Sequence, residues 1–371
     1  MSDSLTISNS EDEWRLFFVL HNLSIKKPIG NKYVAVVPPS DQRIATLTNK
    51  YVDLKYLISN FVDQFNRRVT PCVLIARNDS PSAIFQSDAL VSFRNIIAIC
   101  YIVESWQDYL NRGWCLYSPG YSNYFDIYPI VPSKDYKHFL TISPAVHGLD
   151  MPNEFSGQTS PELNGSLHEI HYDSLIFDTL IREWEKRYVR GKLANWKTTV
   201  LFRSLQMAYQ ASAIPMNNRS TIYDYGLSLA LWVSAFEVLV RPKSEHADLY
   251  KVLNLLGQSR FQSGKLSSKR YSITYKKKRR CQVTLPQKLY YQIYKARNDF
   301  LHGNPVTIKH LYPWGNQKRN LLNCFAPLLY KFALISFLRI YCYNGDIVNL
   351  PFEQYQSIRG LEDGLSKATT N

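Results

Sequence analysis

The sequence predicts an α+β protein, with a mixed α/β N-terminal region followed by an all-α helical bundle. Two short apolar runs typical of strands occur in the first half, and stretches with helical periodicity fill the second half. Between them, residues 117–163 are rich in Pro, Gly, Ser, Asn and Tyr, which makes them the best linker candidate, although their aromatic residues indicate that they pack against other parts of the protein. We therefore expect a mixed region at residues 1–160, a helical domain at 165–345 and a C-terminal tail at 346–371.

The length of the chain supports two units. A chain of 371 residues is longer than a single hydrophobic core usually organises. Hydrophobic residues make up 45% of it and aromatic residues 14%, so both units have enough apolar surface for packed cores. This composition excludes a globally disordered protein.

The first half predicts few regular elements. Residues 33–37 precede two prolines, and residues 72–76 end at an Asn-Asp pair, so each is predicted to be a short strand. Residues 88–110 carry apolar side chains at helical spacing, with Gly113 beyond the end, which predicts a helix.

The second half predicts a bundle of helices. Their expected ranges are 173–189, 195–213, 223–240, 245–256, 286–302 and 316–343. Residues 223–240 are almost wholly apolar, so we expect them to form the central buried helix. Pro327 should kink the last helix or split it in two. Residues 258–284 lack a helical period and are expected to form a loop or a β-hairpin around 271–275.

Positive charge is concentrated in one part of the chain. The formal net charge is +14, and no acidic residue lies between Asp248 and Asp299, where thirteen Lys and Arg residues occur. Such a patch attracts a polyanion through charge neutralisation and counterion release, and RNA is the expected partner. A solvated loop or a targeting signal would show the same pattern. The candidate RNA-binding residues are Lys269, Arg270, Lys276, Lys277, Lys278, Arg279 and Arg280.

Several other classes of protein are not expected. The six cysteines form no C-x-x-C pair, which is typical of reduced thiols. Residues 1–13 are polar and acidic, unlike a secretory signal, and the apolar runs 96–103 and 332–338 are too short to span a bilayer. His168 and His171 lack a third ligand nearby, so no metal or other cofactor is expected. We expect a cytoplasmic protein with no membrane partner.

One motif points to chemistry. Arg297 and His302 are separated by four residues near the C-terminal end of a predicted helix, with Asn298 directly after the Arg and Gly303 directly after the His. Earlier in the chain, the apolar segment 229–239 carries one charge, Glu237. This combination resembles the HEPN superfamily and its R-x(4–6)-H signature, most closely the Apea-like branch, whose motif commonly reads Arg-Asn-x-x-x-His-Gly. The resemblance covers residues 165–345 and leaves the first 160 unexplained.

The resemblance implies an activity. HEPN domains are helical, usually dimeric, and often metal-independent ribonucleases of toxin, stress or phage-defence systems. Arg297 and His302 would then be the catalytic pair, with Asn298 as a polar partner and Glu237 in support. The residue types suit the cleavage of RNA by its own 2′-hydroxyl. An imidazole transfers protons near neutral pH, and a guanidinium stabilises charge that develops on phosphate oxygens.

Two alternatives stay open at this stage. Positions five apart on a helix point about 140° apart, so Arg297 must reach around the helix, or a second subunit must complete the site. Arg297 could instead pair with Glu237, because a buried carboxylate needs a partner. In that case the domain would be a catalytically inactive HEPN-type dimerisation or RNA-binding module.

Overall fold

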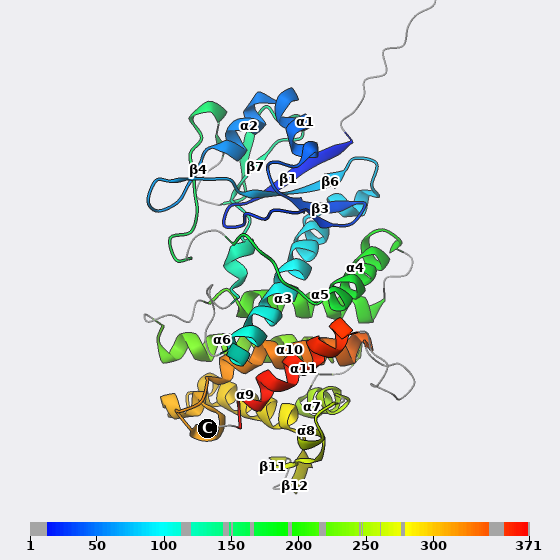
Figure 1. Cartoon of the computed structure of the whole chain (residues 1–371), viewed down its shortest axis with the longest axis vertical. Helices are drawn as coiled ribbons and strands as arrows, with labels where there is room; N and C mark the ends of the chain where they lie inside the picture. The colour runs from blue at the N-terminus through cyan, green and yellow to red at the C-terminus, as the bar shows by residue number, and fades with distance from the viewer. Residues whose placement is uncertain are drawn as a thin grey trace, which may run out of the picture. The chain divides into compact units, whose positions relative to one another are not determined.

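The protein is α+β, as predicted, and falls into two compact units. Its computed structural model, drawn in Figure 1, describes residues 13–112, 120–143, 148–149, 151–163, 167–191, 195–214, 220–244, 246, 248–259, 261–275, 279–340 and 352–369. The first unit comprises residues 1–90 and 124–169, and the second comprises residues 91–123 and 170–371.

The first unit is built on an antiparallel four-stranded sheet with the order β1-β6-β3-β2. These strands are β1 Trp14–Leu20, β2 Ile29–Gly30, β3 Val34–Val37 and β6 Cys72–Arg77. The two predicted strands are confirmed as β3 and β6, which occupy the centre of the sheet. Every residue of β3 and all but the last of β6 are buried, which explains why both are continuous apolar runs rather than alternating ones.

Two further helices belong to this unit, α1 Gln42–Lys50 and α2 Val52–Ser59. The Asp41 carboxylate caps α1 by accepting a hydrogen bond from the backbone N–H of Arg43 at 3.0 Å. The buried residues Ile44 and Leu47 of α1 and Leu54, Leu57 and Ile58 of α2 pack into the core beside the sheet. None of these elements was predicted from the sequence.

Residues 117–163 are not a linker, contrary to the prediction. They supply β7 Ile130–Pro132, β8 Phe139–Thr141, β9 Gly148–Leu149 and β10 Gly157–Gln158. The first three form one small sheet, and β10 joins β4 Phe61–Val62 and β5 Arg68–Val69 in another. Tyr136, Phe139 and Phe155 from this segment are buried in the core of the first unit. Strands of two or three residues carry no periodicity, so only the aromatic content indicated that the segment packs.

The second unit is a helical assembly that carries one hairpin. Its helices are α3 Ser87–Arg112 (from Val91 onward), α4 Ser174–Tyr188, α5 Trp196–Ala211, α6 Ile222–Leu239, α7 Leu249–Gly257, α8 Gly264–Ser268, α9 Leu285–Leu301, α10 Leu322–Leu338 and α11 Phe352–Ser366. The hairpin pairs β11 Tyr271–Tyr275 with β12 Arg279–Val283. The unit is therefore not all-α, and the hairpin alternative for residues 258–284 is the correct one. Among the described residues of both units, short 3-10 helices occur at Ser82–Phe85, Ser122–Phe125, Pro152–Glu154, Ile308–Leu311 and Pro313–Gly315.

The predicted helices α4, α5, α6 and α9 are confirmed to within a few residues, but other boundaries differ. Helix α7 begins after Asp248, whose carboxylate accepts from the Lys251 N–H, rather than after Ser244. Helix α10 begins at Leu322 rather than at residue 316 and continues through Pro327 as one element, so of the two predicted effects of Pro327 the split does not occur. The expected C-terminal tail contains α11, which belongs to the helical unit, and α3 joins that unit rather than the N-terminal one.

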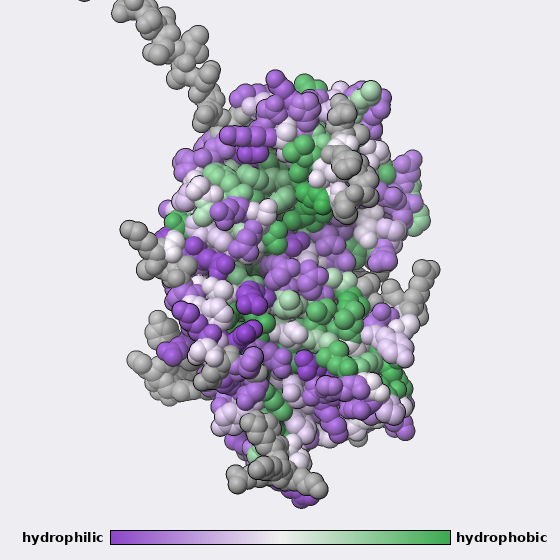
Figure 2. Space-filling model, turned by 180° about the vertical axis from the view of Figure 1, so that it is seen from behind, coloured by the Kyte–Doolittle hydropathy of each residue, from purple (hydrophilic) through white to green (hydrophobic). Residues whose placement is uncertain are grey.

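Two of the described helices, α3 and α6, are long and apolar enough to cross a membrane by length and composition alone. The apolar runs that were expected to be too short lie within longer helices, α3 and α10. A core helix passes the same test, and 89% of the apolar window of α3 is buried inside the protein. The corresponding share in α6 is 44%, so α6 is less buried than predicted. It is central to the unit, as predicted, because it contacts α5, α7, α9 and α10. On the face turned away in Figure 1, apolar side chains form patches among polar ones (Figure 2).

A buried ammonium group ties several helices of the second unit together. Lys331 on α10 is fully buried, and its Nζ donates to Glu104 and to Gln107 Oε1 (3.1 Å) on α3 and to Ser357 Oγ (3.0 Å) on α11. Ser357 in turn donates to Asp173 Oδ2 at 2.6 Å, just before α4. The three acceptors match the three N–H donors of the ammonium group, so the charge is buried with its hydrogen bonds satisfied.

We expect Lys331→Met to lower the free energy of unfolding by about 3–5 kcal/mol, because it leaves the Glu104 carboxylate with no cation in a low-dielectric site. Urea denaturation at neutral pH measures the change. The double variant Lys331→Met/Glu104→Gln should recover much of the loss, and Lys318→Ala, an exposed lysine, is the matched control. A loss below about 1 kcal/mol in the single variant would contradict this role for Lys331.

Candidate functional site

Helix α9 is capped at both ends, which fixes the position of the motif that it carries. Thr284 and Gln287 form a capping box at its start, with the Thr284 N–H donating to Gln287 Oε1 at 2.8 Å. At its end, Gly303 adopts a φ of +69°, and the N–H of Asn304 donates to the Asp299 carbonyl at 3.0 Å. This glycine-dependent helix end places His302 directly after the last turn.

Helix α9 packs closely against α6. The rings of Tyr290 and Phe236 lie 4.8 Å apart. Further along, Phe300 covers Gly226, where a Cβ atom would lie 2.3 Å from the Phe300 ring. The residue numbers rise on one helix and fall on the other, so the pair is antiparallel. The glycine permits the close approach that brings the polar groups of both helices together.

The guanidinium of Arg297 faces α6. Its Nη1 donates to Asn298 Oδ1 at 2.8 Å, and its Nη2 lies 4.0 Å from Glu237 Oε2. The side chains of Arg297 and Glu237 are 22% and 24% exposed, so neither is sealed inside the bundle. The Nε of Arg297 is buried and has no hydrogen-bond partner among the described residues. Arg297 is therefore held by Asn298, attracted by Glu237, and still has free hydrogen-bonding capacity.

Burial is the largest cause of the pKa shifts around this guanidinium. Burial raises the pKa of Glu237 above the ordinary value, and the charge of Arg297 partly opposes that shift. Burial also raises the pKa of the Tyr290 hydroxyl well above its ordinary value, and the charge of Glu237 adds to the effect. The Tyr290 hydroxyl is buried without a partner among the described residues. The tyrosine is thus neutral, and the charges of Glu237 and Arg297 act on it.

The imidazole of His302 lies apart from this cluster. His302 is exposed at the end of α9, and no hydrogen bond or ion pair joins it to Arg297 in the described part of the chain. Helix geometry separates the two directions by about 140°, as expected from the sequence. The structure therefore brings Arg297, Asn298 and Glu237 together, and leaves His302 on another side of the same helix end.

The predicted basic residues lie on and beside the hairpin β11–β12. Lys269 and Arg270 are exposed just before β11, and the Lys269 Nζ lies 5.4 Å from the centre of the Tyr271 ring. Arg280 is exposed on β12, and Arg279 opens that strand. Lys276, Lys277 and Lys278 lie outside the described residues.

The hairpin is fastened to α9 by two hydrogen bonds. Lys288 Nζ donates to the Ser272 carbonyl and the Tyr291 hydroxyl donates to the Thr274 carbonyl, both at 2.9 Å. Burial lowers the pKa of Lys288, and the charge of Lys295 lowers it further. Positive charge therefore accumulates along the side of α9 that carries the hairpin.

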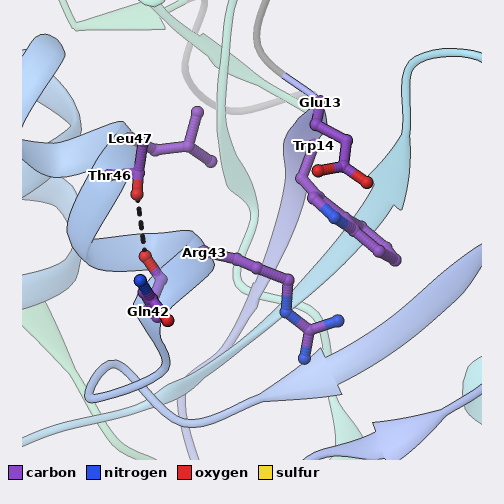
Figure 3. A pocket seen from close by; sticks show the side chains of 6 residues that line it. All are labelled: Glu13, Trp14, Gln42, Arg43, Thr46 and Leu47. Carbon is purple, nitrogen blue, oxygen red and sulfur yellow. Dashed lines mark hydrogen bonds between the residues drawn. The ribbon is translucent and has the colours of Figure 1, made fainter.

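A cavity of about 300 Å³ lies in the first unit (Figure 3). Arg43 on α1 extends toward Trp14 on β1, with its guanidinium carbon 4.8 Å from the centre of the indole ring. Asp41 already binds this guanidinium through two hydrogen bonds of 2.8 and 2.9 Å, which hold the pKa of Asp41 below its ordinary value. The cation is thus neutralised within the unit. Sequence reasoning missed this cavity because neither of its elements was predicted.

Among the described residues, no group of three or more His, Cys, Asp or Glu side chains is placed to hold a metal ion. No protein-family model, no curated protein and no solved structure matches this chain. The resemblance to the HEPN superfamily therefore rests on the sequence motif alone.

We expect Arg297→Ala to lower the free energy of unfolding by only about 1 kcal/mol, because the pair with Glu237 is long and partly exposed. The loss should depend on pH. The folded-state pKa of Glu237 is raised, so ionisation of Glu237 weakens the fold as the pH rises past its ordinary value of 4.5. Removing Arg297 takes away the opposing charge and enlarges that penalty.

Urea denaturation at about pH 4 and about pH 7 measures this effect, and the larger loss should occur at about pH 7. In a Glu237→Gln background the pH dependence of the loss should disappear, since no carboxylate is left to ionise. A loss of several kcal/mol at both pH values would instead assign Arg297 a purely structural role.

Proposed function

We propose that the second unit is a metal-independent endoribonuclease of the HEPN type, with Arg297 and His302 as catalytic residues. The proposal is carried by one observation: an exposed imidazole and a partly exposed guanidinium occur at the same end of α9. The motif spacing that resembles the family supports it, as does the basic hairpin fastened to the same helix.

The reaction is a transesterification within RNA. The 2′-oxygen attacks the adjacent phosphorus, the bond from phosphorus to the 5′-oxygen breaks, and the products carry a 2′,3′-cyclic phosphate and a 5′-hydroxyl. His302 would transfer the proton that leaves the 2′-hydroxyl or the one that the 5′-oxygen gains. Arg297 would donate hydrogen bonds to the phosphate oxygens, with Asn298 orienting its guanidinium and Glu237 attracting it. By resemblance, the setting would be a stress, toxin or phage-defence system in the cytoplasm.

A non-catalytic module is the second candidate, and one observation favours it. Arg297 is turned toward Glu237 and Asn298 rather than toward His302. In that case the unit would be an inactive HEPN-type domain that dimerises or binds RNA, and the only role of Arg297 would be to stabilise the contact between α6 and α9.

The proposed assembly is a homodimer through the exposed side of α6. Tyr223 and Leu227 on α6 are 76% and 55% exposed, and Leu301 at the end of α9 is 57% exposed. The contact between Gly226 and Phe300 brings these parts of the two helices together. Exposed aromatic and aliphatic side chains beside a site that one chain does not close are typical of an interface between copies. A second copy would bring its own Arg297 and His302 to this face.

We expect the full chain to cleave single-stranded RNA in EDTA and to leave 2′,3′-cyclic ends. Removal of the imidazole in His302→Ala should lower the rate about 10²- to 10⁴-fold, and Arg297→Ala about 10²- to 10³-fold. Gel electrophoresis of end-labelled RNA measures both the rates and the products.

The matched controls are His138→Ala, which removes another exposed imidazole, and Arg182→Ala, which removes an exposed arginine. Both should cleave like the parent protein. If the parent leaves RNA intact, or if a folded His302→Ala protein cleaves equally well, the catalytic proposal fails and the non-catalytic module is favoured.

We also expect Leu227→Glu to convert the dimer to a monomer, because it places a charge in an apolar interface. Light scattering with size-exclusion chromatography measures the mass, and cleavage should fall in step with the fraction of dimer. Val52→Glu, at a similarly exposed aliphatic residue of the first unit, is the control. A parent protein that is monomeric while it cleaves RNA would contradict a site that needs two copies of the chain.

A further inference from the structure

A second cavity, of about 410 Å³, lies beside α9. Two of its lining residues, Lys295 and Asp299, are each two positions from Arg297 and therefore point about 160° away from it around the helix. Lys295 and Asp299 of α9 form one wall, and the segment from Thr307 to Gly315 forms the other. All of these residues belong to the second unit. The cavity shares no lining residue with the cluster of Arg297, Asn298 and Glu237, so it needs an explanation of its own.

The cavity has an aromatic surface that is held in place. Trp314 is 39% exposed and adopts a φ of +54°, a left-handed conformation that costs a bulky residue free energy. Gly315, with a φ of +69°, allows the turn that follows it. The Tyr271 ring lies 5.9 Å from the indole, and the Arg319 guanidinium lies 5.0 Å from its centre. The indole is thus braced by neighbours and still open to a ligand.

The other groups of the cavity suit a nucleotide. Lys295 and Lys309 are exposed cations at its wall, and Asp299 supplies a carboxylate that Asn304 Nδ2 holds at 3.0 Å. The Nδ1 of His310 accepts the Thr307 N–H at 3.0 Å, which leaves Nε2 as a donor in the neutral ring. A nucleobase offers a π-face together with donors and acceptors at its edge, and its phosphate offers negative charge. Every one of these features has a counterpart in the cavity.

The position along α9 relates the cavity to the proposed catalytic imidazole. Lys295 and His302 are seven positions apart, so they lie on nearly the same side of the helix and about 10 Å apart along its axis. The hairpin fastened through Lys288 and Tyr291 lies on this side as well. An extended strand could therefore pass along one side of α9 from the basic hairpin, over the cavity, to His302.

We propose that this cavity binds one unpaired nucleotide of single-stranded RNA, with its base stacked on Trp314 and its phosphate near Lys295 and Lys309. This inference rests on the proposed function, for which it names the substrate class. A base inside a duplex cannot stack on a side chain without leaving its own stack, so the cavity selects unpaired RNA.

The test measures binding without cleavage. Fluorescence anisotropy with a labelled 12-nucleotide single strand, and with a duplex of the same sequence, is recorded on the full-length His302→Ala protein. Adding Trp314→Ala should weaken binding of the single strand about 5- to 150-fold, the range for the loss of one stacked base, and leave duplex binding unchanged. Trp314→Phe should retain most of the affinity.

If Trp314→Ala does not fold, a comparison of two lysine variants, Lys309→Ala and Lys318→Ala, still tests the proposal. Lys309→Ala should weaken binding of the single strand more than Lys318→Ala does, because both lysines are exposed in the same segment and only Lys309 lines the cavity. The inference is overturned if Lys309→Ala binds the single strand as Lys318→Ala does. It is also overturned if a folded Trp314→Ala protein binds the single strand as well as the His302→Ala parent does, or loses affinity for single strand and duplex equally. Tight competition by a free mononucleotide would show that the cavity binds a small effector, and it would overturn the proposal that the cavity binds a nucleotide within an RNA strand.

Failure of this inference and failure of the proposed function give different results. Binding that depends on Trp314 in a protein that never cleaves RNA would refute the nuclease and leave the cavity assignment standing. Cleavage by the parent protein, with single-strand binding and KM unchanged in Trp314→Ala, would leave the nuclease standing and refute the cavity assignment.

Discussion

The antiparallel contact between α6 and α9 is the constraint on which the rest of the candidate site depends. Apolar packing of Phe236 on Tyr290 at one end, and of Phe300 on Gly226 at the other, sets the separation of the two helices. That separation determines which polar groups meet. Glu237 and Arg297 end up close enough to attract each other but not to form a hydrogen bond, and both stay accessible from outside. The contact between α6 and α9 thus holds the Arg297 cation without neutralising its charge fully.

The parts of the fold that the sequence predicted are those in which a single element carries its own signal. Helix α9 has a capping box, a proline in its first turn and a glycine after its end, and β3 and β6 are short apolar runs bounded by turn residues. Most of the missed strands lack such signals, because strands of two or three residues acquire their identity only from the neighbours with which they pair. Some missed elements are longer, namely strand β1 with seven residues and helix α1, which Asp41 caps. Helix α11 was also missed, although Ile358, Leu361 and Leu365 lie at helical spacing and could have revealed it.

The candidate site, like the fold, could be predicted from the sequence only in part. The approach of Arg297 to Glu237 and the divergence of Arg297 from His302 both follow from helix geometry and charge, and both could be stated from the sequence. The hydrogen bond to Asn298 and the cavity lined by Trp314 could not. They depend on a side-chain rotamer in one case, and in the other on a loop that folds back onto α9 after Gly303.

The way in which α9 ends affects how the residue at position 302 can change during evolution. The hydrogen bonds that terminate the helix come from the backbone of Gly303 and Asn304, and they run to the carbonyls of Phe300 and Asp299. The side chain at position 302 takes no part in them and projects outward. A lineage could therefore exchange the imidazole for another group, or regain it, at almost no cost to folding. The proposed reactivity at this position can be gained or lost in one substitution, whereas a substitution at Gly226 or Gly303 would disturb the helix packing or the helix end.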